Sequence, residues 1–485
     1  MKRAKHRLGL LAGISGLGAS LLLARPAAGS DWTRFRGPNG RGVAEAANPP
    51  TRLDPSGARW RASLPRGHSS PVLTPDRIFV TGQQDGRLLT LALDRSSGSV
   101  LWQREAPRPR EQALHERNSP AASTPTTDGR NVFVFFADFG LVSYAPDGQE
   151  RWRLPLGPFS IPNGFGSSPI FAGGLLVLQV DQDRGSYVMA VDPADGSVRW
   201  RTERPEVTHG YSTPVVFTPA AGPAQLILAG SYRITSYLLE TGERLWWSHG
   251  VTWQTKPSPT AGATTVFASG WAPGADAGER MELPPFAEAI RRGDGDGDGK
   301  ISEPEARTGG WRHSGGWGLV DLDDDERLGE SEWEFFRARR AAHNATVAIR
   351  PGSRTGDITD AALLWSYEKA VPVVSSPLLH DGLVYTVKDG GILTALDAET
   401  GRVVKQARLG AAVDSYYASP IAAAGRIYIL SERGTLSVVE AGRDWTLLWS
   451  GELGEPCYAT PAVAGDTLYV RTAEHLYAFG PAESK

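Results

Sequence analysis

A small residue followed by proline recurs eight times along this chain of 485 residues. Five of the seven intervals between these prolines are 41 to 45 residues long, one is 54 and one is 118. The common interval is that of a four-stranded propeller blade. The pairs are Ser70-Pro71, Thr124-Pro125, Ser168-Pro169, Thr213-Pro214, Ser258-Pro259, Ser376-Pro377, Ser419-Pro420 and Thr460-Pro461.

The segment after each proline predicts short strands. Runs such as Ile78–Val80 and Val132–Val134 are β-branched or aromatic, and Gly and Asp turns bound them, as in strands joined by hairpins. Because an isolated hairpin is marginal in water, each blade must bury its faces against its neighbours. The sequence therefore predicts an all-β fold, an eight-bladed β-propeller, in residues 58–270 and 344–485.

The two ends of the repeat region predict how the ring closes. The early segment Ala58–Leu64, which contains Trp60, has no blade before it, and the eighth blade, Thr460–Phe479, lacks a last strand. Joining them would remove both exposed sheet edges. We expect residues 31–57 to form an N-terminal strap on the outside of the propeller.

A spaced tryptophan motif is the most specific part of the repeat. Ala92, Asp94, Gly98 and Trp102 recur with unchanged spacing as Ala190, Asp192, Gly196 and Trp200, and a degenerate copy has Lys405 in place of the tryptophan. The pattern resembles the tryptophan-docking motif of the PQQ-like propeller repeat, seen in quinoprotein dehydrogenases and in the outer-membrane assembly lipoprotein BamB. The resemblance covers most of residues 60–480. We expect each tryptophan to pack between blades, with its N–H on a backbone carbonyl.

Residues 1–30 have the pattern of a signal peptide. A basic start is followed by the apolar stretch Leu8–Leu23 and by small residues at positions 27–30. The apolar stretch is 16 residues long, shorter than the ~20 that span a bilayer. An uncleaved N-terminal anchor is the alternative. We expect a periplasmic or secreted protein with no transmembrane segment after cleavage.

The negative charge of the chain is local. The formal net charge is −3, and removal of residues 1–30, with their five basic residues, makes it −8. Residues 294–332 hold 12 acidic and 4 basic residues, which is also −8. The remainder is about neutral and has no basic patch for nucleic acid. The single cysteine, Cys457, excludes an intramolecular disulfide.

The long interval predicts an insertion in blade five, residues 271–343, with a calcium loop. Residues 294–305 fit the twelve-residue EF-hand loop, which wraps oxygen ligands around a hard cation. A solvated acidic loop is the alternative. The expected ligands are Asp294, Asp296, Asp298, the carbonyl of Lys300, Ser302 and Glu305.

A second loop, which matches the EF-hand pattern less well, follows 27 residues later. Glu326 stands where the first loop has its turn glycine, and Gly329 offers no side chain. We expect Ile301 and Leu328 to pair between the loops and residues 286–292 and 333–340 to form outer helices. One or two Ca²⁺ ions would serve a structural role. The expected ligands of the second loop are Asp321, Asp323, Asp325, the carbonyl of Arg327 and Glu332.

The resemblance implies two classes of function: a non-enzymatic scaffold or binding protein, or a PQQ-dependent dehydrogenase that oxidises an alcohol or sugar. Dehydrogenases of this family usually carry adjacent cysteines beside the quinone, and BamB-type lipoproteins carry a lipidated cysteine after the signal peptide. The lone Cys457 fits neither pattern. We expect a scaffold or binding protein with no catalytic residue, and PQQ as a cofactor only under the alternative.

The axis of the ring is the expected ligand site, because equivalent inner-strand positions converge there. An unknown protein, peptide or small molecule would bind at this mouth. Polar loop or strand-start residues are the alternative. Three residues before each proline stand His68, Ala122, Gly166, Tyr211, Lys256, Val374, Tyr417 and Tyr458. Six residues before three of the prolines stand Asn163, Asp414 and Glu455, which could hold a calcium–quinone complex.

Overall fold

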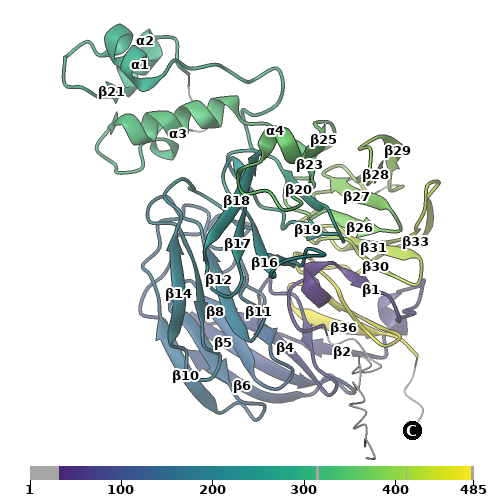
Figure 1. The fold of residues 1–485 in the computed structure, drawn as a ribbon. Helices are drawn as coiled ribbons and strands as arrows, with labels where there is room; N and C mark the ends of the chain where they lie inside the picture. The colour runs from purple at the N-terminus through teal and green to yellow at the C-terminus, as the bar shows by residue number, and fades with distance from the viewer. Residues whose placement is uncertain (1–31, 313–315, 411, 482–485) are drawn as a thin grey trace, which may run out of the picture.

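Eight β-sheets surround a central axis (Figure 1). The structure, a computed structural model, describes residues 32–312, 316–410 and 412–481. The expected signal peptide lies outside these residues. Within them, no helix is long and apolar enough to cross a membrane. The prediction of an eight-bladed propeller is confirmed.

The first four blades follow the chain in order, each with four antiparallel strands from the axis outward. Blade one has β3 (Val72–Leu73), β4 (Arg77–Gln84), β5 (Arg87–Asp94) and β6 (Val100–Ala106). Blade two has β7 (Thr126–Thr127), β8 (Val132–Phe136), β9 (Gly140–Tyr144) and β10 (Glu150–Pro155). Blade three has β11 (Ile170–Ala172), β12 (Leu175–Val180), β13 (Tyr187–Val191) and β14 (Val198–Glu203). Blade four has β15 (Val215–Phe217), β16 (Gln225–Ala229), β17 (Arg233–Leu238) and β18 (Arg244–His249), with β24 (Gly356–Asp357) added in parallel.

The other four blades include the strand that closes the ring. Blade five has β19 (Thr260–Ala261), β20 (Val266–Gly270), β23 (Ala345–Ile349) and β25 (Leu363–Tyr367), preceded by α4 (Thr359–Ala362). Blade six has β26 (Leu378–His380), β27 (Leu383–Lys388), β28 (Ile392–Asp397) and β29 (Val403–Arg408). Blade seven has β30 (Ile421–Ala423), β31 (Arg426–Leu430), β32 (Thr435–Glu440) and β33 (Thr446–Glu452). Blade eight has β34 (Ala462–Ala464), β35 (Thr467–Arg471), β36 (His475–Phe479) and the early strand β2 (Trp60–Ser63), as predicted.

Tryptophans pack between successive blades as the motif predicts, but not every indole N–H reaches a backbone carbonyl. In the described part of the chain the N–H groups of Trp60 and Trp200 have no partner, and that of Trp246 donates to the Gln225 side chain. The Trp102 indole N–H of blade one donates to the Pro146 carbonyl of blade two at 2.8 Å. A Cβ on the turn residue Gly148, whose φ is 83°, would lie 2.7 Å from the Trp102 ring. Trp60 lies against Gly98 of blade one in the same way, so the motif also joins blade eight to blade one.

A closed ring of hydrogen bonds joins the blades at the axis. The Ser or Thr before each repeated proline accepts, through its hydroxyl oxygen, the backbone N–H of the matching residue in the preceding blade. The eight N···O distances are 2.8–3.0 Å. The ring hydroxyls belong to Ser70, Thr124, Ser168, Thr213, Ser258, Ser376, Ser419 and Thr460, and Thr460 N donates to Ser70 to complete the circle.

The N-terminal segment crosses one end of the channel, so the expectation of an external strap is wrong. Trp32 and Arg36 are fully buried. The Arg34 guanidinium donates to the Pro214 carbonyl of blade four at 2.7 Å, and that of Arg36 donates to the Pro377 carbonyl of blade six at 2.7 Å. These contacts bury the segment's polar side chains against inner-strand carbonyls. The segment contains β1 (Val43–Ala44), which pairs in parallel with β30, and the 3-10 helices η1 (Pro38–Gly40) and η2 (Pro55–Gly57).

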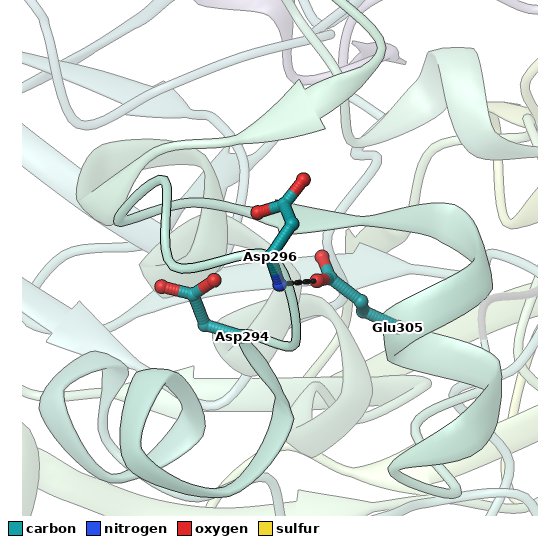
Figure 2. Close-up of side chains that lie close together, drawn as sticks. All are labelled: Asp294, Asp296 and Glu305. Carbon is teal, nitrogen blue, oxygen red and sulfur yellow. Dashed lines mark hydrogen bonds between the residues drawn. The ribbon is translucent and has the colours of Figure 1, made fainter.

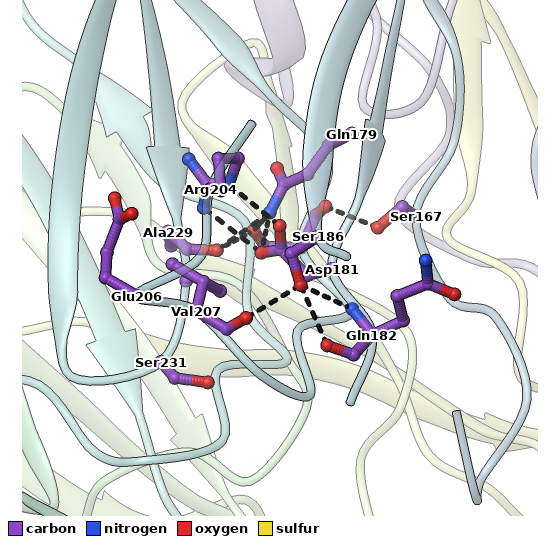
Figure 3. A network of polar contacts seen from close by, with 12 residues as sticks. Ser167, Gln179, Asp181, Gln182, Ser186, Arg204, Glu206, Val207, Ala229 and Ser231 are labelled. Atoms are coloured by element: carbon purple, nitrogen blue, oxygen red, sulfur yellow. Dashed lines mark hydrogen bonds and ion pairs between the residues drawn. The ribbon is translucent and has the colours of Figure 1, made fainter. Parts of the chain in front are cut away.

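A buried ion pair within blade three is hydrogen-bonded to blade four (Figure 3). Asp181, after β12, and Arg204, after β14, are both fully buried, with Oδ1···Nε 2.9 Å apart. Gln179 donates to Asp181, and the Arg204 guanidinium donates to the Tyr237 hydroxyl of blade four at 2.8 Å. Burial lowers the pKa of Arg204, but Asp181, Tyr237 and Glu206 together more than offset this, so the pKa is raised and the guanidinium stays charged.

The connection from β20 to β23 projects from the propeller as a separate layer (Figure 1). It has a small core of its own around Trp311, Trp333 and Phe336. Ile301 pairs with Leu328, as predicted. The elements of the connection are α1 (Phe286–Gly293), β21 (Ile301–Ser302), α2 (Glu303–Thr308), η3 (Trp317–Leu319), β22 (Arg327–Leu328) and α3 (Glu330–Ala341).

Candidate functional site

The axial channel holds a cavity of about 460 Å³. All eight positions located three residues before the repeated prolines line it, and so do all eight ring hydroxyls. Phe35 of the N-terminal segment also lines the cavity. We call the position three residues before each proline the wall position. Along each blade the wall position precedes the ring hydroxyl, and the N-terminal segment contacts residues that follow the ring hydroxyl. The cavity therefore has the ring and Phe35 toward one end and the wall positions toward the other.

One side of the wall is aromatic. The rings of His68 and Tyr458 stack with centroids 4.0 Å apart, and Tyr417 lies 5.4 Å from Tyr458. Arg117 donates to the Tyr417 hydroxyl at 3.1 Å, and Glu432 lies 3.5 Å from Arg117. Burial, with the charge of Arg471, lowers the pKa of His68 to about 3, so its imidazole is neutral. This side can stack on a flat ligand.

The opposite side is polar and holds a lysine. Tyr211 accepts hydrogen bonds from Asn163 at 3.0 Å and from Gln254 at 3.3 Å. Lys256 donates to the Trp271 carbonyl at 3.4 Å, and burial lowers its pKa to about 8. Among the described residues that line the cavity, none carries a carboxylate. The wall can therefore donate hydrogen bonds and offers no acidic ligand to a cation.

Two of the predicted site residues are turned away from the cavity. The Asp414 carboxylate accepts from Ser415 N at 2.8 Å and from Arg433 N. Glu455 accepts from Thr472, and His475 Nδ1 lies 2.6 Å from it. Both carboxylates bond to neighbouring loops, and of these three residues only Asn163 lines the cavity.

In the first acidic loop, three carboxylates point toward one space (Figure 2). Ligand oxygens of Asp294, Asp296 and Glu305 lie within 4.8 Å of one another. Asp294 accepts from Gly299 N at 3.0 Å, and Glu305 accepts from Gly295 N at 2.7 Å and from Ser302 N at 2.8 Å. These bonds hold the carboxylates around a point that a hard cation could occupy.

The second acidic loop repeats the hydrogen bonds of the first with a fixed offset. Asp321 accepts from Glu326 N at 2.9 Å, and Glu332 accepts from Leu322 N at 2.8 Å and from Gly329 N at 3.0 Å. Oxygens of Asp321, Asp323 and Asp325 also lie within 4.8 Å of one another. Glu326 has a φ of 67°, close to the 80° of Gly299. The two loops thus share one backbone conformation, and Glu326 adopts it at a steric cost that glycine avoids.

Basic side chains link the two loops crosswise. Lys300 of the first loop forms an ion pair with Asp325 of the second. Arg327 of the second loop pairs with Asp296 at 3.0 Å and with Asp298. These pairs partly neutralise the carboxylates, and they occupy oxygens that a cation would need. Asp296, Asp298 and Asp325 would therefore have to release these partners in order to ligate a cation.

The insertion lies against the propeller near the cavity wall. The Tyr232 hydroxyl of blade four donates to the Phe335 carbonyl of α3 at 3.1 Å. The Arg339 guanidinium of α3 stacks 3.7 Å from the Trp253 ring centroid, and Trp253 donates to the Pro273 carbonyl at 3.0 Å. Since Pro273 lines the cavity, Trp253 connects α3 to a residue of the cavity wall.

Sequence reasoning missed the ring hydroxyls and the arginines of the N-terminal segment. The signal for the first was present, because every one of the eight small residues before proline is Ser or Thr. For Arg34 and Arg36 the sequence carried no such signal. They donate to backbone carbonyls 180 and 341 residues away, which no side-chain pattern marks, and Arg36 also donates to the distant Thr260 hydroxyl at 3.2 Å.

A family model described as outer membrane protein assembly factor BamB matches residues 56–144, 125–261 and 317–413, which is more than half of the chain. BamB of Alkalilimnicola ehrlichii is 31% identical over 141 residues, which are 29% of this chain and 33% of that protein. The chain thus spans about a third of the length of this curated relative.

Two solved structures share the fold. BamB from Moraxella catarrhalis has a TM-score of 0.52 and 10% identity, and the match covers 89% of this chain and 98% of the other. A europium-containing methanol dehydrogenase has a TM-score of 0.59 and 11% identity, with 93% of this chain and 98% of the other covered. At this identity the likeness shows the fold alone.

Proposed function

The chain belongs to the PQQ-like repeat family described as outer membrane protein assembly factor BamB, and on that basis we propose that it is an exported, non-enzymatic binding protein. Its ligand is a small molecule or peptide held in the axial cavity. Its insertion is an EF-hand pair that binds calcium and holds the adjoining loops in place. The periplasm or the exterior of the cell is the proposed location, because residues 1–30 have the pattern of a signal peptide.

The composition of the cavity wall carries this proposal. Stacked His68 and Tyr458, the hydrogen-bonded Tyr211 and the hydroxyl ring can bind a ligand. A concave pocket with aromatic walls and a few fixed polar groups is typical of ligand sites. The wall has no carboxylate, and burial makes the His68 imidazole a weak base. Binding is therefore favoured over acid–base chemistry.

The quinoprotein alternative fits the wall poorly. A calcium–quinone complex needs carboxylate ligands for its cation, and of the three residues expected to hold one, only Asn163 reaches the cavity. A dye-linked alcohol or sugar oxidation assay after addition of PQQ and Ca²⁺, with an absorption spectrum of the bound quinone, tests this alternative directly. Turnover would overturn the proposal of a non-enzymatic protein.

The binding function predicts that a ligand stays with the purified protein. We expect native mass spectrometry of the protein from its export compartment to show a bound small molecule or short peptide. Ala122→Trp should abolish it, because the added ring fills part of the cavity that Ala122 lines. Ala361→Trp on the exposed surface of α4 is the matched control and should retain the ligand. If the wild type and both variants each show only the ligand-free mass calculated from their own sequence, the proposal is contradicted.

Calcium binding by both loops predicts that glycine at position 326 increases the calcium affinity of the second loop. Glu326→Gly relieves the positive φ, and we expect tighter calcium binding by about fivefold, roughly 1 kcal/mol. Glu326→Gln is the control, since it removes the same charge and keeps the Cβ. Chelator-competition titration measures both. Equal affinities for the two variants would show that the second loop does not bind calcium in this conformation.

A further inference from the structure

Four basic side chains near the axis have no acidic partner among the residues that the structure describes. Arg34, Arg36 and Arg471 are each less than 5% exposed, and Lys256 is partly buried in the cavity wall. The arginines donate to backbone carbonyls, and Lys256 donates to one. A carbonyl dipole satisfies the hydrogen bond and leaves the charge uncompensated. Burying such charges is costly unless a counter-charge is present.

These charges surround the hydroxyl ring. Arg34 and Arg36 contact the carbonyls of Pro214 and Pro377, each directly after a ring residue. Arg471 donates to the carbonyl of Ser69, directly before ring residue Ser70, at 2.9 Å. Lys256 is two residues before ring residue Ser258 and lines the cavity. The ring thus lies in a region of net positive charge.

The ring itself offers hydrogen-bond donors. Each hydroxyl oxygen already accepts a backbone N–H, and its own proton has no acceptor in the described part of the chain. All eight ring residues are at most 4% exposed and line the cavity. A hydroxyl that accepts can still donate. Up to eight O–H groups can therefore donate toward a group on the axis.

We infer that the ring end of the axial cavity is a binding site for a small oxyanion, a carboxylate or phosphate group of the ligand. The inference rests on the proposed binding function and specifies its ligand class. An oxyanion supplies the missing counter-charge, accepts hydrogen bonds from the ring, shares the cavity with the Lys256 ammonium, and meets no carboxylate among the described lining residues. Charge-assisted hydrogen bonds of this kind are roughly twice as strong as neutral ones. The aromatic wall then contacts the rest of the ligand.

Isothermal titration of the full-length mature protein with citrate and with inorganic phosphate, in low-chloride buffer, tests the inference. We expect at least one to bind with a Kd of about 1 mM or tighter. Binding of citrate alone assigns a carboxylate, and binding of phosphate alone assigns a phosphate. Lys256→Met should weaken binding at least tenfold, and Lys256→Arg should retain it. Lys405→Met, which removes a lysine outside the cavity, should leave the Kd unchanged.

The stability of the empty protein separates a binding role from a structural one. Because Lys256 has no counter-charge, Lys256→Met without anion should unfold at the same urea concentration as the wild type or a higher one. Lys256→Gln repeats the test with a polar side chain. The inference would be overturned if neither anion binds, or if Lys256→Met and Lys256→Gln both bind anion as tightly as the wild type. A neutral ligand found by mass spectrometry would overturn the anion class and leave the binding function intact.

Discussion

Asp181→Ala should lower the free energy of unfolding by about 3–5 kcal/mol, the largest effect that we expect from a single substitution. The change leaves the Arg204 guanidinium fully buried without its carboxylate. Gln179 also loses an acceptor at the same site. The midpoint of urea unfolding, followed by tryptophan fluorescence, measures the effect.

Two comparisons isolate the cause. Glu203→Ala breaks an exposed pair with Arg201, 2.7 Å apart, and should cost less than about 1 kcal/mol. The double variant Asp181→Leu/Arg204→Met removes both charges and should recover most of the loss. If Asp181→Ala costs no more than Glu203→Ala, or if the double variant is no better than the single one, the buried charge does not explain the effect.

The blades could be predicted from the sequence because each repeat contacts its neighbours in the same way. Gly98 and Gly196 have positive φ and stand four residues before Trp102 and Trp200, and the tryptophan of the preceding blade packs on each glycine, so one copy explains the others. Ile301 and Leu328 were predictable for a related reason, since the two acidic loops are themselves a repeat.

The contacts that the sequence did not reveal are those that occur once. The N-terminal segment has no period, and its arginines bind backbone carbonyls. Asp181 stands in the stretch Asp181–Asp183, which has the composition of a turn, and nothing local marks Arg204 as its partner. Asp414 shows the limit of spacing: its distance from the proline fixed the position of its backbone, but bonds to Ser415 and Arg433 fixed the direction of its carboxylate.

Removal of calcium should loosen the insertion and leave the propeller intact. Strand β21 of the first acidic loop pairs with strand β22 of the second, and the two contribute Ile301 and Leu328 to the small core of the insertion. Without cations, the net charge of −8 in residues 294–332 repels itself. Ions that bind only the folded state stabilise it by ~2.7 kcal/mol at a hundredfold excess over Kd. The propeller has its own closed ring of inter-blade contacts, so its stability does not depend on bound calcium.

Limited proteolysis with and without EGTA measures this difference. We expect cleavage within residues 280–343 after chelation, while the eight blades stay resistant. Asp294→Ala/Glu305→Ala should be cut in the same region even in calcium, because it removes two of the three clustered ligands. Glu279→Ala/Glu330→Ala removes the same charge from exposed positions of the insertion and should behave as the wild type. Loss of the whole propeller would show that blade five depends on the insertion, and no change on chelation would show that the acidic loops do not bind calcium.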